Sequence, residues 1–527
     1  RQNDTVFDIA DGAAARDLVI SAAIGNGSAG NHNMIKNGAG TMALTAANTF
    51  TGSTTINAGT LELGHVNALQ NSSLNTGSAG SQTVTFGVAG DNTYNLGGLY
   101  GANGMNIGAN SLAIGNNDPG AFTGTIIGTG GVTVKGGALK MGGIQAYSGV
   151  TNVQGGYLEV SQAPLDISNS VLNIGPGAST LRSVDIWAGT LTVRGLTGGT
   201  ATTKIVANGT RTLEIRTPTG ESYSYDGVIA NNTWNGAAVL SLTKSGAGTQ
   251  ALTGVNTYTG ATAVTEGTLL VNGSLSTGTV TVAAGATLGG TGTVGGEVRA
   301  NGALSAGTSI GTLSLAQGLQ MIASASIENE LEGTTTDLIA VTGNLMLDGT
   351  VNVSGTPDDG TYTIMTYTGT LTDNGLVVGT MPAGKNCVVD LTTAGQVNLV
   401  VTTEGGQTYE EWADDQFGAS YPADPLTAPD ADPDRDGKTN EQEKDDGTDP
   451  LDLRILNIVE GDTGWEITFC AKPTPTYTLE YTDDLLTTPG SWTDLATVTM
   501  PTEGIERTVV DTETASPVEG FYRIRGD

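Results

Sequence analysis

The sequence predicts an all-β protein whose larger part is a stacked solenoid of short strands. Short runs that alternate polar and apolar residues between Gly or Asn positions are typical of strands joined by tight turns. Examples are Thr83–Phe86, residues 190–193 and residues 279–282. In addition, residues 36–61 return 208 positions later as residues 244–269, with 16 of 26 aligned positions identical. Such internal repetition is typical of architectures that stack one structural unit upon the next.

The composition favours a long, thin core over one large globular core. Of the 527 residues 79 are glycine, hydrophobic residues make up 38% and aromatic residues 5%, whereas ordinary proteins hold about 7% glycine. Small side chains fill a narrow axis, but a wide core needs more bulky ones. The chain has no Gly-X-Y period, which excludes collagen, and its regular alternation argues against disorder.

The net charge of −32 excludes further classes of protein. A chain this acidic repels nucleic acids and anionic membrane surfaces, so we expect neither as a partner. No run of about 18 apolar residues occurs, so no membrane span is predicted in this chain. Residue 1 is Arg rather than Met, from which we expect that a signal peptide has been removed and that the protein is extracellular.

Changes in composition, strand length and polar–apolar alternation divide the chain into four segments. Residues 1–320 are the solenoid repeat rod. The strands of 321–403 are longer and alternate better, which indicates the C-terminal end of the solenoid. Residues 404–452 form an acidic linker with a short helix. Residues 453–527 contain strand-like runs enriched in aromatic residues, which predicts a small β-sandwich module.

A third, degraded copy of the repeat occupies residues 147–158. If the copies are structurally equivalent, residues at matching positions face the same way. We therefore expect Leu61 and Leu269, which close the two full repeats, to point into the axis of the solenoid.

The acidic linker holds 16 Asp or Glu residues against three Lys or Arg residues. Within it, residues 409–417 predict a short helix with Trp412 and Phe417 on one face. Further along, oxygen-bearing residues recur at a fixed spacing. Counted from Asp432, carboxylates occupy positions 1, 3 and 5, Gly position 6, Asn position 9 and Glu position 12.

This spacing predicts a Ca²⁺ loop, because Ca²⁺ takes six to eight hard oxygen ligands and a glycine at position 6 permits the sharp turn. The alternative is a solvated acidic linker. A second set of ligands could come from Asp445, Asp446 and Asp449. The candidate ligands of the first ion are Asp432, Asp434, Asp436, Lys438 (at the position that offers its backbone carbonyl), Asn440 and Glu443.

The pattern Lys-x-Gly-Ala-Gly-Thr … Asn-Thr-(Phe/Tyr)-Thr-Gly … Gly-Thr-Leu of the two repeats resembles the passenger-associated repeat of autotransporter proteins, as does the stretch 285–296. The resemblance covers residues of about 36–403 and implies a right-handed parallel β-helix exported to a bacterial cell surface. The loop 432–443 is similar to the calcium loops of EF-hand, dockerin and thrombospondin type 3 proteins.

Candidate catalytic residues are few. His32 and His65 are the only histidines and lie in repeats rich in Gly and Asn, where we expect turn or surface roles. Acidic residues of 36–320 are scattered, which does not favour an enzyme, although polysaccharide-active enzymes occur among parallel β-helices. Cys387 and Cys470 could form a disulfide or remain separate buried thiols.

These observations predict a structural or adhesive protein of the cell surface rather than an enzyme. The runs 4–9 and 17–20 look strand-forming from the start, with no helix before them in this sequence to cover the first coil. An uncovered coil can pair with another chain, so we expect a fibre subunit that joins its own copies head to tail. The alternatives are a monomeric adhesin stalk and a polysaccharide-active enzyme; extracellular polysaccharide is the other candidate partner.

Overall fold

The computed structural model divides the chain into two compact units, residues Arg1–Thr403 and Glu404–Asp527, and each is described by itself. The residues that it describes are 4–27, 30–115, 120–232, 236–403, 409–417, 425–435, 437–446, 449–451, 454–461, 464–470, 476–482, 493–499, 506–511 and 521–526.

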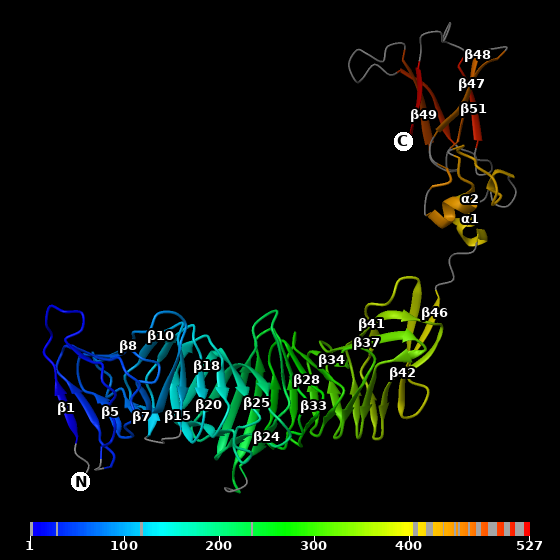
Figure 1. Cartoon of the computed structure of the whole chain (residues 1–527). Coiled ribbons are helices and arrows are strands. Elements are labelled where there is room, and N and C mark those ends of the chain that lie inside the picture. The colour runs from blue at the N-terminus through cyan, green and yellow to red at the C-terminus, as the bar shows by residue number, and fades with distance from the viewer. Residues whose placement is uncertain are drawn as a thin grey trace. The chain divides into compact units, whose positions relative to one another are not determined.

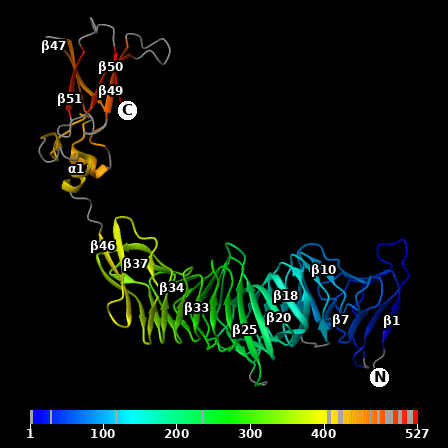
Figure 2. The ribbon, with the colours of Figure 1, turned by 180° about the vertical axis from the view of Figure 1, so that it is seen from behind.

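The first unit is a parallel β-solenoid of about 16 turns. Figures 1 and 2 show its strands stacked one after another along the unit. Each strand pairs in parallel with the strand about one coil further along the chain, beginning with β1 (Thr5–Asp8) on β3 (Met34–Asn37) and ending with β41 (Thr350–Pro357) on β44 (Val377–Val378). The pairings follow three rows along the axis. The predicted fold class is confirmed.

The rows contain the following strands. The long strands β7, β9, β15, β18 and β20 turn a corner and contribute to two rows or more, and residues 143–144 of β15 pair with β18 in the second row. The first row holds β1, β3, β5 (Ser53–Ile56), β7 (Leu69–Asn75), β9 (Thr93–Tyr100), β12 (Ala121–Phe122), β15 (Ala138–Ile144), β18 (Tyr157–Ile174), β19 (Val184–Ile186), β21 (Lys204–Ala207), β24 (Val228–Asn231), β29 (Ser274–Leu275), β32 (Thr293–Val294), β35 (Thr312–Leu315), β39 (Leu338–Val341) and β42 (Gly360–Tyr367). The second row holds β2 (Leu18–Ile20), β4 (Thr41–Leu44), β6 (Thr60–Leu63), β8 (Thr83–Phe86), β10 (Met105–Gly108), β13 (Ile126–Gly128), β16 (Ala146–Tyr147), β18, β20 (Thr190–Gly198), β22 (Thr210–Arg216), β25 (Val239–Ser245), β27 (Thr262–Val264), β30 (Val280–Val282), β33 (Val298–Ala300), β36 (Leu319–Met321), β40 (Leu345–Leu347) and β43 (Leu371–Asp373). The third row holds β7, β9, β11 (Ser111–Ile114), β14 (Val132–Val134), β17 (Thr151–Val153), β18, β20, β23 (Ser222–Tyr225), β26 (Thr249–Leu252), β28 (Thr268–Val271), β31 (Thr287–Gly290), β34 (Ala303–Ala306), β37 (Ser326–Gly333), β41 and β44.

One continuous hydrophobic core runs along the axis, from Ile9 to Val401. It is built by alternation, because every second residue of a strand points inward. Leu61 and Leu269 are both 0% exposed, so the inward orientation predicted for them is confirmed. Leu269 stacks in register with Leu288 of the next coil.

The three copies of the repeat start on three different rows. The strand that opens the first copy is β3, in the first row, whereas the second copy opens with β25, in the second row. The strand at the matching position ahead of the degraded copy is β14, in the third row. The repeat therefore encodes local contacts between a coil and its successor, and it functions on any face of the solenoid.

The end of the solenoid departs from the parallel pattern. β38 (Thr335–Thr336) forms an antiparallel hairpin with β37. β46 (Gln396–Thr403) then pairs antiparallel with β42, and β45 (Lys385–Asp390) pairs antiparallel with β46. These strands fold back over the last coils, so the two ends of the solenoid present different edges.

The second unit combines two helices with two small antiparallel sheets. The predicted helix is confirmed as α1 (Tyr409–Phe417), and Trp412 and Phe417 are buried. A 3₁₀ turn, η2 (Pro425–Thr427), precedes α2 (Asn440–Asp446). The sheets consist of β47 (Arg454–Gly461), β48 (Gly464–Cys470) and β51 (Glu506–Asp511), and of β50 (Thr493–Thr499), β49 (Thr476–Thr482) and β52 (Phe521–Gly526).

The two sheets contact each other through aromatic rings. Phe469 of β48 and Tyr477 of β49 lie with ring centroids 6.3 Å apart in an edge-to-face arrangement. Both side chains are buried. Such a pair adds to the stabilisation that the buried area provides, and it gives the predicted β-sandwich its core.

Candidate functional site

The lysine of each full repeat is a buried structural residue. Lys244 is 0% exposed, and its Nζ donates to the carbonyls of Ser245 (2.9 Å), Gly246 (2.6 Å) and Glu266 (3.2 Å). The last of these acceptors belongs to the next coil. The three N–H groups of one ammonium therefore bond three carbonyls at one corner. The carbonyl of Ser245 also accepts from the backbone N–H of Thr217 (3.0 Å).

Lys36 makes the same contacts in the first repeat. Its Nζ donates to the carbonyls of Asn37 (3.0 Å), Gly38 (2.8 Å) and Ala58 (3.0 Å). Burial lowers the pKa of both amines, and that of Lys244 falls to about 8. At neutral pH the amine of Lys244 is therefore still mostly protonated, and it carries the three N–H donors that its three contacts require.

The glycine two residues after the lysine is also explained by the corner. Gly246 has a φ of +71°, and a Cβ there would lie 2.4 Å from the carbonyl oxygen of Thr217 in the preceding coil. Only glycine permits both this left-handed conformation and this close approach.

A buried amide side chain joins consecutive coils in all three copies. Asn256 accepts from the backbone N–H of Ile229 (2.9 Å) and donates to the carbonyl of Ser274 (3.0 Å), which lie in the coils on either side. Asn48 does the same in the first copy. In the degraded copy Gln145 accepts from the N–H of Ile126 (2.8 Å). Because Gln replaces Asn there, the sequence comparison missed this position.

The aromatic residue is a tyrosine with a buried hydroxyl contact in the second and the degraded copy, whereas the first copy has Phe50. Tyr258 bonds Thr262 (2.6 Å), and Tyr147 of the degraded copy bonds Thr151 (2.7 Å). Val134 occupies the position of the lysine in that copy, since it pairs with the next coil as Lys36 and Lys244 do. The degraded copy thus keeps the aromatic contact and loses the amine.

We predict that Lys244→Met destabilises the solenoid, because three carbonyls lose their donor while the side-chain volume is nearly kept. The expected loss is about 2–4 kcal/mol in the free energy of unfolding, measured by urea denaturation. Lys135→Met is the control, since Lys135 is exposed and donates to Asn95 at the surface. Equal stability of the two variants would contradict the role assigned to Lys244.

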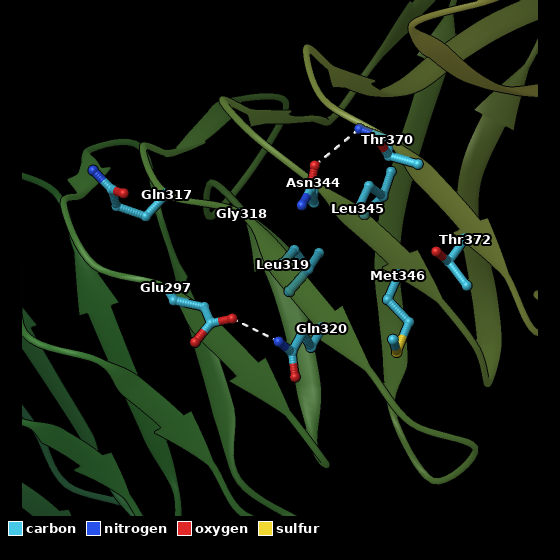
Figure 3. Close-up of a pocket in the computed structure, with 10 residues that line it drawn as sticks. All are labelled: Glu297, Gln317, Gly318, Leu319, Gln320, Asn344, Leu345, Met346, Thr370 and Thr372. Atoms are coloured by element: carbon cyan, nitrogen blue, oxygen red, sulfur yellow. Dashed lines mark hydrogen bonds between the residues drawn. The ribbon is translucent and has the colours of Figure 1, made fainter.

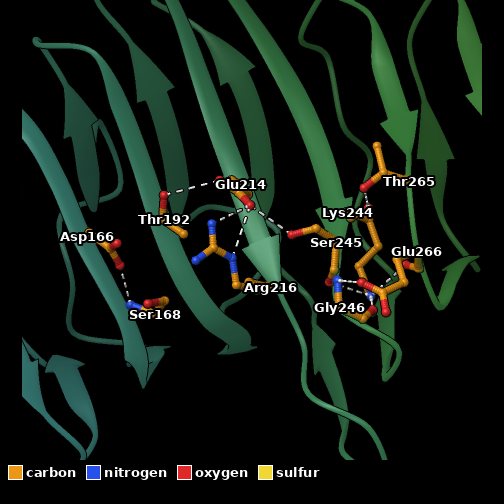
Figure 4. Close-up of polar contacts among 10 residues, drawn as sticks. All are labelled: Asp166, Ser168, Thr192, Glu214, Arg216, Lys244, Ser245, Gly246, Thr265 and Glu266. Carbon is orange, nitrogen blue, oxygen red and sulfur yellow. Dashed lines mark hydrogen bonds and ion pairs between the residues drawn. The ribbon is translucent and has the colours of Figure 1, made fainter.

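Polar residues on the outward face of the second row are engaged with one another (Figure 4). The carboxylate of Glu214 accepts from the Arg216 guanidinium (3.0 Å) and the Ser245 hydroxyl (2.8 Å). Thr192 of the preceding coil also donates to it (3.4 Å). This acid is held by donors from three coils, and its contacts are those of a residue that links coils.

The two histidines lie far from this cluster. Nδ1 of His65 accepts from the backbone N–H of Asn67 (3.0 Å) and closes a turn. His32 lies near the N-terminal end, beside Met34 and Phe50. Cys387 is a buried free thiol, and the side chain of Cys470 lies outside the described residues.

The predicted calcium loop folds as a compact turn that leads into α2. Gly437, with a φ of +99°, donates its N–H to Oδ2 of Asp432 (3.0 Å). Thr439 and Gln442 cap the helix reciprocally, since the N–H of Thr439 reaches Oε1 of Gln442 (2.9 Å) and the N–H of Gln442 reaches Oγ1 of Thr439 (3.4 Å). This capping box fixes where α2 begins.

Three of the predicted ligands are buried in this turn. Asp434 and Glu443 are each 1% exposed, and Asn440 is 0% exposed. The amide nitrogen of Asn440 donates to the carbonyls of Leu426 (2.9 Å) and Ala428 (2.8 Å). Its Oδ1 is buried and accepts no hydrogen bond within the described residues.

Two buried carboxylates and a buried amide oxygen fit a hard cation, because charged groups are costly to bury without a counter-charge. Asp432 and Lys438 are partly exposed. Asp436 lies outside the described residues, as do the side chains of Asp445 and Asp446. Among the described residues, no three acidic, His or Cys side chains converge into a group that could hold a metal.

The part of the chain that the structure describes contains no helix long and apolar enough to cross a membrane.

Fold and site together define a parallel β-solenoid whose repeats lock each coil to its neighbours. Residues 34–63 and 242–271 match the family described as passenger-associated-transport-repeat. These are the two segments that contain Lys36 and Lys244. The chain is also similar to the adhesin BmaC autotransporter of Brucella suis biovar 1 (strain 1330), with 38% identity over 126 residues. This match covers 22% of the chain and 4% of that protein.

Proposed function

We propose that this chain is an extracellular part of a bacterial surface protein, in which the solenoid acts as a structural and adhesive rod. One observation carries the proposal: each segment that matches the passenger repeat contains a buried lysine and a buried asparagine whose hydrogen bonds join successive coils. The similarity to a named adhesin over 126 residues supports the adhesive role.

The contacts of the titratable residues support a structural rather than a catalytic role. Glu214 is engaged by donors from neighbouring coils, and Arg194 pairs with Glu221, which also accepts from Tyr223 (2.5 Å). General acid–base catalysis needs a group whose proton can reach a substrate. These groups are committed to contacts within the solenoid.

Surface display tests the adhesive role. We expect non-adherent bacteria that carry this chain on a heterologous anchor to attach to host cells or to coated surfaces more than bacteria with the anchor alone. Attachment should fall when soluble chain is added as a competitor, because both compete for one receptor. Equal attachment with and without the chain would contradict the proposal.

A second candidate function is head-to-tail assembly into fibres, which the N-terminal coil favours. Among the described residues β1 pairs with β3 alone, and Val6 (53%) and Val19 (48%) are exposed. Beside them lies a shallow, mostly apolar hollow formed by Phe7, Ile24 and others. An open strand edge of this kind accepts a further strand, and joining unlike ends propagates into a filament.

We predict that the purified chain associates at high concentration and that Val6→Lys with Val19→Lys prevents this, because charge on the open coil opposes stacking. Light scattering measures the mass. Val150→Lys is the matched control, since Val150 is also exposed (41%) but lies within the solenoid. A monodisperse monomer for the unmodified chain would overturn the fibre candidate and leave a monomeric stalk.

We also propose that Ca²⁺ stabilises the second unit. Asp434, Asn440 and Glu443 would hold the ion with their buried oxygens. Asp432, Asp436 and the carbonyl of Lys438 complete the loop as its spacing predicts. The cation would neutralise carboxylates that otherwise repel one another.

Chelation is expected to lower the melting temperature of the second unit and to leave that of the solenoid unchanged, as calorimetry of the full chain can show. Binding to the native state alone adds about 2.7 kcal/mol at a hundredfold excess of ligand over Kd. Asp434→Asn with Glu443→Gln should lose this response. Glu441→Gln changes an exposed residue of the loop that is not a predicted ligand, and it should keep the response. Identical melting curves with and without chelator would exclude the calcium site.

A further inference from the structure

A polar hollow of about 400 Å³ lies on the outward face of the second row, near the end of the solenoid (Figure 3). It extends across four successive coils, which contribute one set of side chains each. In chain order these are Glu297, then Gln317 and Gln320, then Asn344 and Met346, then Thr370 and Thr372.

The regular stacking of the coils creates this hollow. Arg299, Gln320, Met346 and Thr372 follow one another in register on β33, β36, β40 and β43. Gly318, which leads into β36, has a φ of +114°, and a Cβ there would lie 2.9 Å from the carbonyl oxygen of Asn344. Gly318 is buried and lines the hollow between the outward side chains.

Several hydrogen-bonding groups face the hollow without using their capacity. The side chains of Gln317 and Thr372 are exposed and make no hydrogen bond within the described residues. Oδ1 of Asn344 accepts from the N–H of Thr370 (2.9 Å). This bond does not use the two N–H donors of the Asn344 side-chain amide. These groups differ from Glu214, whose contacts are satisfied by neighbouring coils.

The hollow also carries little net charge. The carboxylate of Glu297 accepts from Arg299 (2.9 Å) and from the amide of Gln320 (2.6 Å). Its charge is therefore balanced at one end of the hollow. The rest of the lining consists of amides, hydroxyls, the thioether of Met346 and the apolar residues Gly318, Leu319 and Leu345. A chain of net charge −32 repels polyanions.

We propose that this hollow binds a neutral oligosaccharide that lies across the coils, along the axis of the solenoid. Amides and hydroxyls in this arrangement match the hydroxyl groups of sugars, and Met346 offers an apolar surface to a sugar ring. The spacing of adjacent strands, about 4.8 Å, is close to the length of one pyranose unit in an extended glycan. Successive coils can thus contact successive sugars. The proposal rests on the adhesive function above and names its ligand class.

An array of defined neutral and acidic glycans, together with extracellular matrix proteins, provides the probes. The unmodified chain is expected to retain neutral oligosaccharides of several sugars. Gln317→Trp with Thr372→Trp fills the hollow from two exposed positions and is expected to weaken this binding about tenfold or more. Thr281→Trp is the matched control, because Thr281 is exposed on the same outward line but outside the hollow. Circular dichroism and melting temperature verify that all three chains fold alike.

Three results would overturn the proposal: no neutral glycan retained, retention that the double variant does not weaken, or retention of acidic glycans or matrix proteins alone. The adhesive function and the oligosaccharide site can be distinguished if bacteria that display the chain still attach although the array shows no binding of a neutral glycan. The adhesive function then stands and the oligosaccharide site falls. Loss of attachment in the display assay would instead contradict the adhesive function itself.

Discussion

The structure depends on one constraint: each coil must place its backbone about 4.8 Å above the coil before it, with like positions stacked in register. A coil alone buries almost nothing, because its inward side chains are small and its backbone groups pair only with neighbours. Stacking supplies both the core and the hydrogen bonds. This explains how a chain with 5% aromatic residues maintains one continuous core from Ile9 to Val401.

The constraint is most demanding at the corners, where the chain leaves one row. The repeat places three polar contacts at fixed positions. The lysine amine donates to three carbonyls, and the asparagine amide bridges the coils on either side. The tyrosine hydroxyl, where present, bonds a threonine. Because these contacts reach no further than the adjacent coils, the same sequence can open on any of the three rows. Between these positions the outward face is free to vary, and the hollow at Gly318 arises from that freedom.

Much of the fold could be predicted from the sequence because it depends on local patterns. Alternation identified β8, the repeats placed Leu61 and Leu269 in the core, and the run 409–417 is helix α1. The assignment of each strand to one of the three rows could not be predicted, because the sequence of a strand does not indicate which face of the solenoid it occupies. The role of Gln145 depends on the coils next to it. The burial of Asp434 and Glu443 agrees with the loop spacing, but Asp436 lies outside the described residues, and the calcium site remains a prediction.

The distance between two spin labels on one outward line tests the stacking most directly. Ile144 and Thr281 are both exposed, and the line from one to the other passes in register through Asp166, Thr192, Glu214, Thr243 and Ala263. In a chain with Cys387 and Cys470 replaced by alanine, labelled cysteines at Ile144 and Thr281 are six strand spacings apart. The account predicts a narrow distribution of distances near 29 Å in electron paramagnetic resonance, about 4.8 Å for each coil. A broad distribution, or one centred far from this value, would contradict the continuous stack.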